Sequence, residues 1–230
     1  MIKKISLKNI NFGFNQKAFF KNLSINFDTK GISIIIGPNG SGKSLITKLL
    51  KGIILPHSGE IQLRSEKATP KISYLSQKIT FLRRDVHSNL AYPLVIRNYQ
   101  NEQIKLKVSE TLKNFNFLDK VNFSARSLSK GNKQFLAFIR SQIIRYDILV
   151  LDEPCSNLDF ESIKIIEKYL LKLKKEKKII MVTHDMFQAM RLADEIIIIN
   201  NGELIEASKK KDILKSKNSF TQNFFTKHIF

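Results

Sequence analysis

Short runs of branched apolar residues recur along this chain of 230 residues. Three of them, Ile32–Ile36, Ile148–Leu151 and Ile179–Thr183, are almost wholly apolar and show no alternation with polar positions. Such a run predicts a strand that is buried on both faces, as strands of parallel sheets are. A fourth, shorter strand is predicted at Ile72–Leu75.

Between these runs, apolar residues recur at helical spacing. The pattern predicts helices at Glu102–Asn114 and Asn132–Tyr146, an amphipathic helix at Glu161–Lys174, and another that begins near Gly42. Strands that alternate with helices indicate an α/β fold with a mostly parallel sheet. The length suits one domain over residues 1–230, and the sequence shows no internal repeat and no linker.

A glycine-rich loop follows the first apolar run and opens a predicted helix. Glycines let backbone N–H groups turn inward around a phosphate, and the positive end of the helix faces the same charge. The pattern predicts a nucleotide phosphate loop, in which Lys43 reaches the β- and γ-phosphates of ATP and Ser44 binds Mg²⁺. A plain glycine turn with a solvated lysine would not explain the flanking strand and helix. The loop residues are Gly37, Pro38, Asn39, Gly40, Ser41, Gly42, Lys43 and Ser44.

Two acidic residues, Asp152 and Glu153, follow the strand Ile148–Leu151. Open α/β sheets bind their ligands beyond the carboxyl ends of the strands. Asp152 is predicted to hold Mg²⁺ through its water shell, and Glu153 to polarise the water that attacks the γ-phosphate. The alternative is a strand end capped by two solvated acids, and the phosphate loop upstream argues against it.

A Ser/Gly turn, Leu128–Gln134, opens a helix just before that acidic strand. With this order of motifs, the chain resembles the nucleotide-binding subunit of ATP-binding cassette (ABC) transporters over nearly its full length. The resemblance implies a P-loop NTPase fold with a mostly parallel core sheet and a helical lobe inserted at approximately 78–145. It also implies an antiparallel β layer that includes Ile2–Asn11 and Leu23–Phe27. Two cassettes, as a homodimer or as one copy with a relative, would sandwich ATP between them.

In this resemblance the turn is the signature motif, which usually has the sequence Leu-Ser-Gly-Gly-Gln. Ser129, Gly131 and the N-terminus of the following helix would face the γ-phosphate of the ATP held by the opposite subunit. Lys130 replaces the first glycine of the motif. Its side chain would either point to solvent or add a positive charge near the phosphate. The sequence therefore supports the prediction of ATP binding more strongly than any prediction of the hydrolysis rate.

The resemblance implies four further site residues. Phe14 would stack on adenine, where tyrosine is commoner; the alternative is an ordinary core aromatic in a chain with 17 Phe. Gln77 would touch Mg²⁺ and the attacking water, and His184 would contact the γ-phosphate, so that both act with Glu153 in catalysis. A structural histidine at a strand end is the alternative for His184. Asp159 would lie in the loop that crosses the dimer.

The formal net charge of +19 requires an explanation of its own. A positive charge of this size attracts nucleic acid or anionic lipid. The same net charge also arises when lysines are spread over solvated faces without a charged partner. ABC-type ATPases that act on nucleic acid generally carry two cassettes or a long coiled coil. Here only about 85 residues without sustained heptads separate the phosphate loop from the signature. An ABC-type ATPase that acts on nucleic acid or on a macromolecular complex is therefore the alternative hypothesis, and nucleic acid is not the expected partner.

No apolar run approaches the roughly 18 residues that cross a bilayer, and the N-terminus lacks the apolar core of a signal peptide. Cys155 is the only cysteine, which fits a reducing compartment and a small buried residue. We therefore expect a peripheral protein on the cytoplasmic side of the cell membrane, held there by a partner.

The segment Gln77–Tyr92 is expected to dock on a transmembrane permease subunit through apolar and cationic side chains. This segment, Leu45 in the phosphate-loop helix and the run Gln188–Asp194 resemble the ATPase subunit of bacterial tungstate-type oxyanion importers. The sequence therefore predicts an ATP-hydrolysing subunit that energises import of a tungstate- or molybdate-like oxyanion, with a solute-binding protein as an indirect partner. Another solute, and export, are the alternatives, because the solute never touches this subunit.

Overall fold

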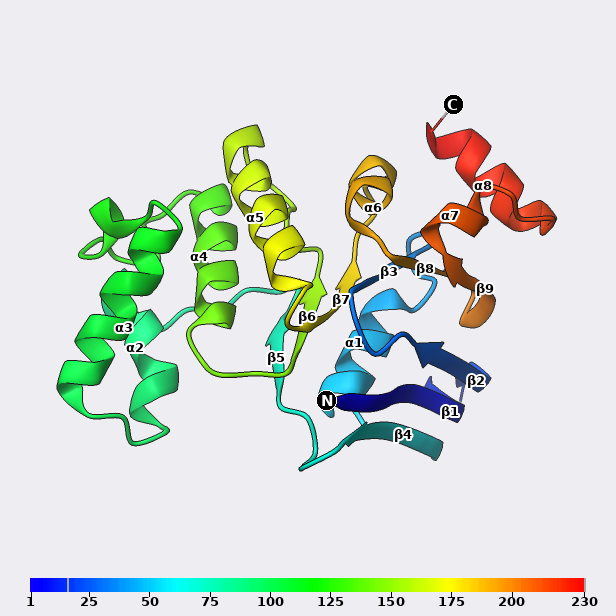
Figure 1. The fold of residues 1–230 in the computed structure, drawn as a ribbon, viewed down its shortest axis with the longest axis horizontal. Coiled ribbons are helices and arrows are strands. Elements are labelled where there is room, and N and C mark those ends of the chain that lie inside the picture. The colour runs from blue at the N-terminus through cyan, green and yellow to red at the C-terminus, as the bar shows by residue number, and fades with distance from the viewer. Residues whose placement is uncertain (16, 230) are drawn as a thin grey trace.

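The computed structural model describes residues 1–15 and 17–229 and contains two β-sheets flanked by helices (Figure 1). The larger sheet has the strand order β5-β6-β7-β3-β8-β9, in which β9 is antiparallel and the other five strands are parallel. The predicted α/β class with a mostly parallel core sheet is confirmed. The strands are β5 (Ile72–Leu75), β6 (Ile148–Asp152), β7 (Lys178–Val182), β3 (Ile32–Ile36), β8 (Glu195–Asn200) and β9 (Glu203–Lys209).

The central strands are buried on both faces, which explains why their sequences do not alternate. Successive residues of β3 enter different cores: Ile34 packs on the side of the helices α5 and α6, and Ile35 on the side of α1. Figure 1 shows α5 and α6 above the sheet, and α1 with the antiparallel sheet below it. The bounds of these helices are Lys43–Lys51 for α1, Phe160–Leu173 for α5 and Met186–Leu192 for α6.

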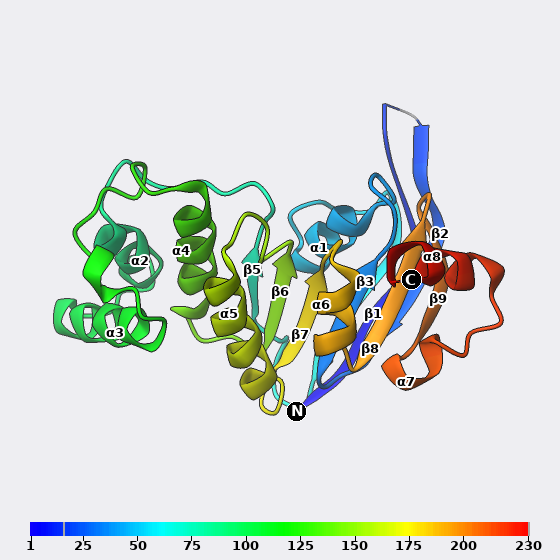
Figure 2. The ribbon, with the colours of Figure 1, turned by 90° about the horizontal axis from the view of Figure 1, so that it is seen from above.

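The smaller sheet is antiparallel, with the order β2-β1-β4. Its strands are β1 (Ile2–Phe14), β2 (Lys17–Phe27) and β4 (Ser58–Ser65), so both predicted strands of this layer are present and longer than expected. Asn9 and Asn22 adopt positive φ where the β1–β2 register shifts, as in β-bulges. Figure 2 shows β1 and β2 extending beyond the rest of the molecule.

A lobe of helices lies at the opposite end of the molecule from the antiparallel sheet (Figure 1). An aromatic cluster ties this lobe to α5, because the ring of Phe115 lies 5.7 Å from that of Phe138 and 4.9 Å from that of Tyr169. The lobe contains α2 (Val86–Val95), α3 (Asn101–Asn114), the short 3-10 helix η1 (Leu118–Lys120) and α4 (Lys130–Gln142).

The helix predicted at Asn132–Tyr146 has different ends in the structure. It begins at Lys130, because the side chain of Ser129 caps it, and it ends at Gln142. Tyr146 lies beyond the end of the helix; its ring is buried in the core and its hydroxyl donates a hydrogen bond to Gln142. The chain then enters β6. The helices predicted at Glu102–Asn114 and Glu161–Lys174 agree with α3 and α5 within one residue at each end, and the helix predicted to begin near Gly42 is α1.

The C-terminal segment packs beside α6 and β9 (Figure 2). It contains α7 (Lys210–Ile213) and α8 (Ser219–Ile229). The carboxylate of Glu206 on β9 accepts hydrogen bonds from Ser216 and Thr221, which fixes the start of α8 against the sheet.

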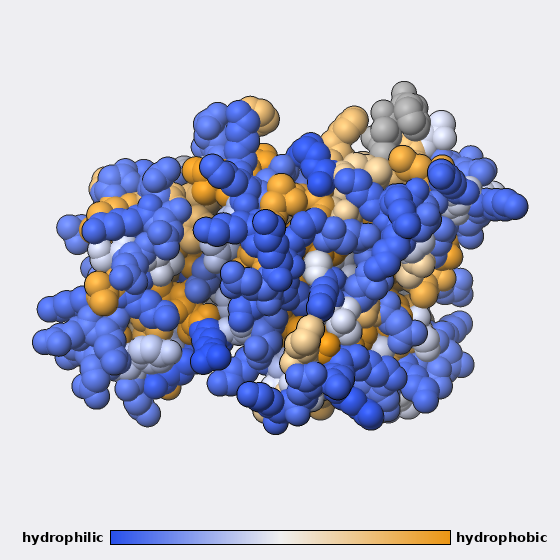
Figure 3. All heavy atoms as spheres, in the orientation of Figure 1, coloured by the Kyte–Doolittle hydropathy of each residue, from blue (hydrophilic) through white to orange (hydrophobic). Residues whose placement is uncertain are grey.

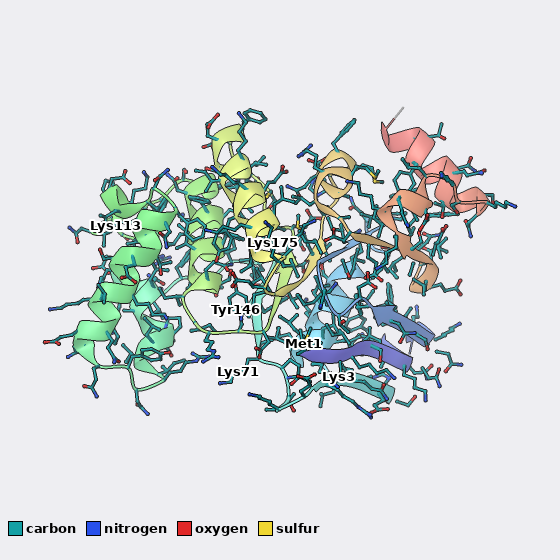
Figure 4. The ribbon with its side chains drawn as sticks, in the orientation of Figure 1. Met1, Lys3, Lys71, Lys113, Tyr146 and Lys175 are labelled. Carbon is teal, nitrogen blue, oxygen red and sulfur yellow. The ribbon has the colours of Figure 1, made fainter. Side chains whose placement is uncertain are left out.

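Figure 3 shows a face that is mostly polar, and Figure 4 shows the side chains of the same face. Figure 4 labels Lys71, Tyr146 and Lys175, which precede β5, β6 and β7 in the chain. This face therefore carries the amino ends of the parallel strands, and their carboxyl ends lie on the far side. Within residues 1–15 and 17–229, no helix is long and apolar enough to cross a membrane.

Lys178, at the start of β7, is buried in the core. Lys178 is 1% exposed, and its ammonium donates hydrogen bonds to Ser33 Oγ at 2.5 Å and to the carbonyl of Lys30 at 3.2 Å. The Ser33 hydroxyl in turn donates to Glu195. Burial lowers the pKa of Lys178 to about 8, and the carboxylate of Glu195 opposes this shift only in part.

This low pKa predicts a pH dependence of stability. Above about pH 8 the folded protein releases the Lys178 proton while the unfolded chain keeps it up to about pH 10.5, so the free energy of unfolding should rise across this window. A shift of this size corresponds to a rise on the order of 3 kcal/mol. Denaturant unfolding from pH 7 to 10.5, compared between the protein and Lys178→Met, isolates the contribution. Lys175→Met, at an exposed lysine, is the control, and an equal pH dependence in all three proteins would contradict the prediction.

Candidate active site

The phosphate loop joins β3 to α1 at the carboxyl end of the parallel sheet. Its backbone requires glycine at Gly42, where φ is +104° and a Cβ would lie 2.6 Å from the ring of Phe19. Gly42 is also the N-cap of α1, so the first N–H groups of that helix face the loop. The loop thus combines backbone donors with a helix N-terminus, as an anion site does.

Lys43 lies within this loop and is 8% exposed. Its ammonium donates hydrogen bonds to the carbonyls of Gly37 and Pro38, at 2.8 Å each. Burial lowers the pKa of Lys43, and the nearby carboxylates of Glu153 and Asp152 raise it in part. In the described part of the chain no carboxylate forms an ion pair with Lys43, so its charge is available to an anion.

Asp152 ends β6 and is fully buried. Its Oδ1 accepts a hydrogen bond of 3.0 Å from the hydroxyl of Ser44, the residue after the phosphate-loop lysine. Its Oδ2 is buried and has no hydrogen-bond partner among residues 1–15 and 17–229. Burial raises the pKa of Asp152, and the hydrogen bond from Ser44 lowers it in part. A buried carboxylate oxygen without a donor is the arrangement expected of a cation ligand.

Glu153 contacts His184, which lies two residues after the end of β7. The distance between Glu153 Oε2 and His184 Nδ1 is 2.7 Å, and Glu153 is buried while His184 is largely exposed. Burial raises the pKa of Glu153, and the neighbouring His184 lowers it in part. A carboxylate with a raised pKa is a stronger base and is suited to take a proton from water.

The backbone of Glu153 is in the left-handed region, with φ of +53°. For a residue with a side chain this conformation costs about 1–3 kcal/mol and persists only where the surroundings enforce it. Here the Glu153 N–H donates to the carbonyl of Val182 at 3.0 Å, which holds the residue against β7. Strain of this kind is typical of active sites.

The signature turn lies directly against the loops after β6. A Cβ on Gly131 would be 2.8 Å from the carbonyl oxygen of Asn157, so this close approach requires glycine. Ser129 caps α4 by accepting a hydrogen bond of 3.1 Å from the N–H of Asn132. Lys130 is exposed in the first turn of α4. Asn132 also stands where the usual motif has glutamine, a second departure that the sequence analysis missed.

Gln134 is a further residue that sequence reasoning missed. Its amide nitrogen donates to the carbonyls of Glu153 and Pro154, at 2.9 and 3.0 Å, and the side chain is 3% exposed. The only signal in the sequence is an amide that falls on the apolar face of α4. Direct hydrogen bonds therefore join α4, the helix that follows the signature turn, to the backbone of Glu153 and Pro154.

The structure places the remaining predicted residues around this centre. Phe14 is 56% exposed at the end of β1, so it is not an ordinary core aromatic, and its ring meets that of Phe12 edge-on at 5.1 Å. Gln77 is exposed two residues after β5; because the parallel register pairs Leu75 with Leu151, this position runs alongside Glu153. Its side chain is not hydrogen-bonded to the acidic pair in the described ranges.

Asp159 has a local role that its sequence position did not reveal. It is the N-cap of α5 and accepts a hydrogen bond of 2.8 Å from the N–H of Ser162, which lowers the pKa of its carboxyl group. The structure therefore brings the phosphate loop, Asp152, Glu153 and His184 together within one chain. Phe14, the signature turn and Asp159 make their contacts elsewhere, with Phe12, Asn157 and Ser162 respectively.

Comparisons with known proteins agree with this geometry. The sequence profile of the ABC transporter family matches residues 20–156. The molybdate/tungstate import ATP-binding protein of Methanocaldococcus jannaschii is 36% identical over 213 residues, which are 89% of this chain and 70% of the relative. The tungstate uptake system ATP-binding protein of Peptoclostridium acidaminophilum is 30% identical over 209 residues, 89% of this chain and 98% of the relative.

A further relative, the phosphate import ATP-binding protein of Saccharolobus solfataricus, is 30% identical over 91% of this chain and 90% of its own length. Among solved structures, a dimeric ATP-binding cassette in a post-hydrolysis state with ADP and phosphate superposes with a TM-score of 0.80. It is 24% identical, over 90% of this chain and 98% of that one, and so supports the fold.

The phosphate loop, the buried acidic pair and the signature turn on this fold define a nucleotide-binding cassette. The chain belongs to the ABC transporter family, as one of its ATP-binding subunits and ATP hydrolases.

The position of Glu153 predicts the behaviour of Glu153→Gln. The variant should lose turnover by about 100-fold or more, because the amide cannot take a proton from water. It should still bind ATP and form a stable dimer, since the phosphate loop is unchanged. Phosphate release and light scattering with ATP measure the two effects. The control is Glu176→Gln, which neutralises an exposed acid after α5. A Glu153→Gln protein that stays monomeric with ATP would contradict this prediction.

Neighbouring positions of the signature turn should respond differently to substitution. Gly131→Ala should lower ATP turnover by about tenfold or more, because the new methyl group displaces the loop that contains Asn157. Lys130→Gly should change turnover by less than about threefold, since the side chain is exposed. Steady-state hydrolysis with matched thermal unfolding measures both. Complete loss of hydrolysis in Lys130→Gly would show that the lysine belongs to the site.

Proposed function

We propose that this chain is the ATP-hydrolysing subunit of an importer for a tungstate- or molybdate-like oxyanion. The contact between Glu153 and His184, beside the phosphate loop, is the observation that carries the hydrolytic part of this proposal, and the relatives support its import part. Glu153 acts as the base toward the attacking water, and His184 orients its carboxylate and contacts the γ-phosphate. Lys43 supplies positive charge to the β- and γ-phosphates, where charge develops during phosphoryl transfer.

The residues around Asp152 fit Mg²⁺. The buried, unpartnered Oδ2 of Asp152 and the adjacent hydroxyl of Ser44 supply the oxygen ligands that this ion prefers. Together with Gln77 they would hold Mg²⁺ against the phosphates of ATP. The ion, when bound, neutralises part of the phosphate charge.

Two copies of the chain complete the site in this proposal. The exposed ring of Phe14 stacks on adenine of the ATP bound by its own chain, and Ser129 and Gly131 face the γ-phosphate bound by the other copy. Asp159, at the start of α5, lies at the contact between the copies. The dimeric arrangement of the structurally similar cassette supports this assignment.

A basic cleft suits a membrane partner. It has a volume of about 690 Å³, and a second space of about 300 Å³ adjoins it through Ile72 and Ile144. The second space reaches the Gln77–Tyr92 segment at Ile79. In the described part of the chain, apolar and cationic side chains line both spaces and no carboxylate does. An amphipathic segment with acidic side chains is its natural complement. The cations are Lys51, Lys71, Arg97, Arg140 and Arg145.

One of these cations connects the cleft to the catalytic side of the sheet. The guanidinium of Arg140, on α4, lies 4.6 Å from the centre of the Phe81 ring, which follows Gln77 in the chain. A permease segment that extends from the cleft into the smaller space, which Arg140 and Ile79 line, would therefore touch the same loop that carries Gln77. We infer that the permease holds the protein on the cytoplasmic side of the membrane.

The relatives support the choice of solute. Proteins named for import of molybdate or tungstate are 36% and 30% identical to this chain. A phosphate import protein is also 30% identical, and all three names refer to tetrahedral oxyanions. The solute-binding protein of such a system would choose among them, because this subunit reaches only the permease.

The test is purification of the tagged protein from native membranes in detergent, followed by mass spectrometry and tungstate uptake. We expect a multi-span permease to remain bound after a high-salt wash. We also expect Arg97→Glu to reduce its recovery by about tenfold, since a like charge then faces the acidic segment. Arg64→Glu, on β4 outside the cleft, is the matched control and should retain the permease.

Other outcomes would revise the proposal in different ways. Uptake of phosphate but not tungstate by the purified complex would keep the importer and change the solute. Recovery of nucleic acid without a membrane protein would replace the importer with a nucleic-acid ATPase, and would make the net charge of +19 the better guide.

A further inference from the structure

The hydrogen bonds of Gln134 join two parts of the site that the sequence keeps apart. Gln134 lies in the second turn of α4, five residues after Ser129, and Glu153 follows β6. Both amide hydrogens of Gln134 are used, one on the carbonyl of Glu153 at 2.9 Å and one on that of Pro154 at 3.0 Å. A buried amide that satisfies two consecutive carbonyls fixes the position of that peptide segment.

That segment contains the left-handed residue of the site. The φ of +53° turns the backbone of Glu153 sharply at the end of β6, and the carboxylate then lies 2.7 Å from His184. The Glu153 carbonyl also accepts the Ser156 hydroxyl at 3.2 Å. Gln134 is the partner of this carbonyl that comes from outside the Glu153–Ser156 turn. The strained conformation therefore depends on contacts from another element.

We propose that Gln134 is a positioning residue for ATP hydrolysis, which holds Glu153 in its left-handed conformation and thereby aims the carboxylate. The proposal rests on the role of Glu153 as base. Because Gln134 is on the same helix as Ser129 and Gly131, a shift of α4 moves the Glu153 backbone directly. The orientation of the base is thus linked to the position of the signature helix.

Packing alone does not account for a glutamine here. The neighbouring residues Phe135, Leu136, Phe138 and Ile139 are buried apolar side chains that hold α4 in the core. A side chain of similar length without donors would satisfy the same packing. Such a side chain would leave the carbonyls of Glu153 and Pro154 without this donor. Its loss would therefore affect the conformation of the turn at Glu153 more than that of the helix.

The experiment compares Gln134→Met with Gln142→Met, which removes an amide from the other end of the same helix. We expect Gln134→Met to lower kcat by about 10- to 100-fold with KM for ATP changed by less than about threefold, because the phosphate loop is untouched. Gln142→Met should leave kcat within about twofold of the parent protein. Should Gln134→Met fail to fold, Gln134→Asn keeps the amide but shortens its reach, and the same loss of kcat is expected.

A double-mutant cycle separates positioning from general damage. In the Glu153→Gln background there is no base to aim, so adding Gln134→Met should not lower the residual turnover further. An equal fold-loss in both backgrounds, or turnover near that of the parent in folded Gln134→Met, would overturn the inference. If Glu153→Gln itself kept full turnover, the proposed base would be wrong. That result is distinct from the failure of Gln134 alone.

Discussion

The hydrogen bond between Ser44 and Asp152 joins the two halves of the catalytic centre. The residues come from α1 and β6, and the strand β7 lies between β6 and the β3 strand that leads into α1. The two residues thus belong to parts of the chain that β7 separates in the sheet. The bond forms only if β3, β7 and β6 are adjacent and in register. The parallel sheet, with strands buried on both faces, is the part of the fold that guarantees this geometry.

Burial of charge at this edge of the sheet has a cost that shapes the site. Three charged residues, Lys43, Asp152 and Glu153, are nearly inaccessible to water. Burial lowers the pKa of the lysine and raises the pKa of the two acids, so in each case it favours the uncharged form. The positive charge of Lys43 lies close enough to the two carboxylates to reduce this cost. The Oδ2 atom of Asp152 still lacks a hydrogen-bond partner in the described residues. Bound ATP with its cation would supply the missing partners, so affinity for the nucleotide and stability of the site are physically linked.

Much of this fold could be predicted from the sequence because its strongest signals are local. β3, β6 and β7 match their predicted runs to within a residue, because short apolar runs rich in β-branched residues are typical of buried strands. The phosphate loop and the acidic pair also fell where their motifs predict. What could not be predicted depends on tertiary contacts. The left-handed conformation of Glu153 depends on hydrogen bonds from Gln134 and Val182, and Asp159 takes a local role as the N-cap of α5.

The close approach of Gly131 to Asn157 determines which substitutions the signature turn can accept. Because the nearby backbone atom belongs to the same chain, the folding of a single subunit already requires glycine at position 131, before any partner or nucleotide binds. Position 130 is exposed and meets no such barrier. A single folded subunit therefore accepts a lysine at position 130, whereas any side chain at position 131 would have to move the backbone of Asn157.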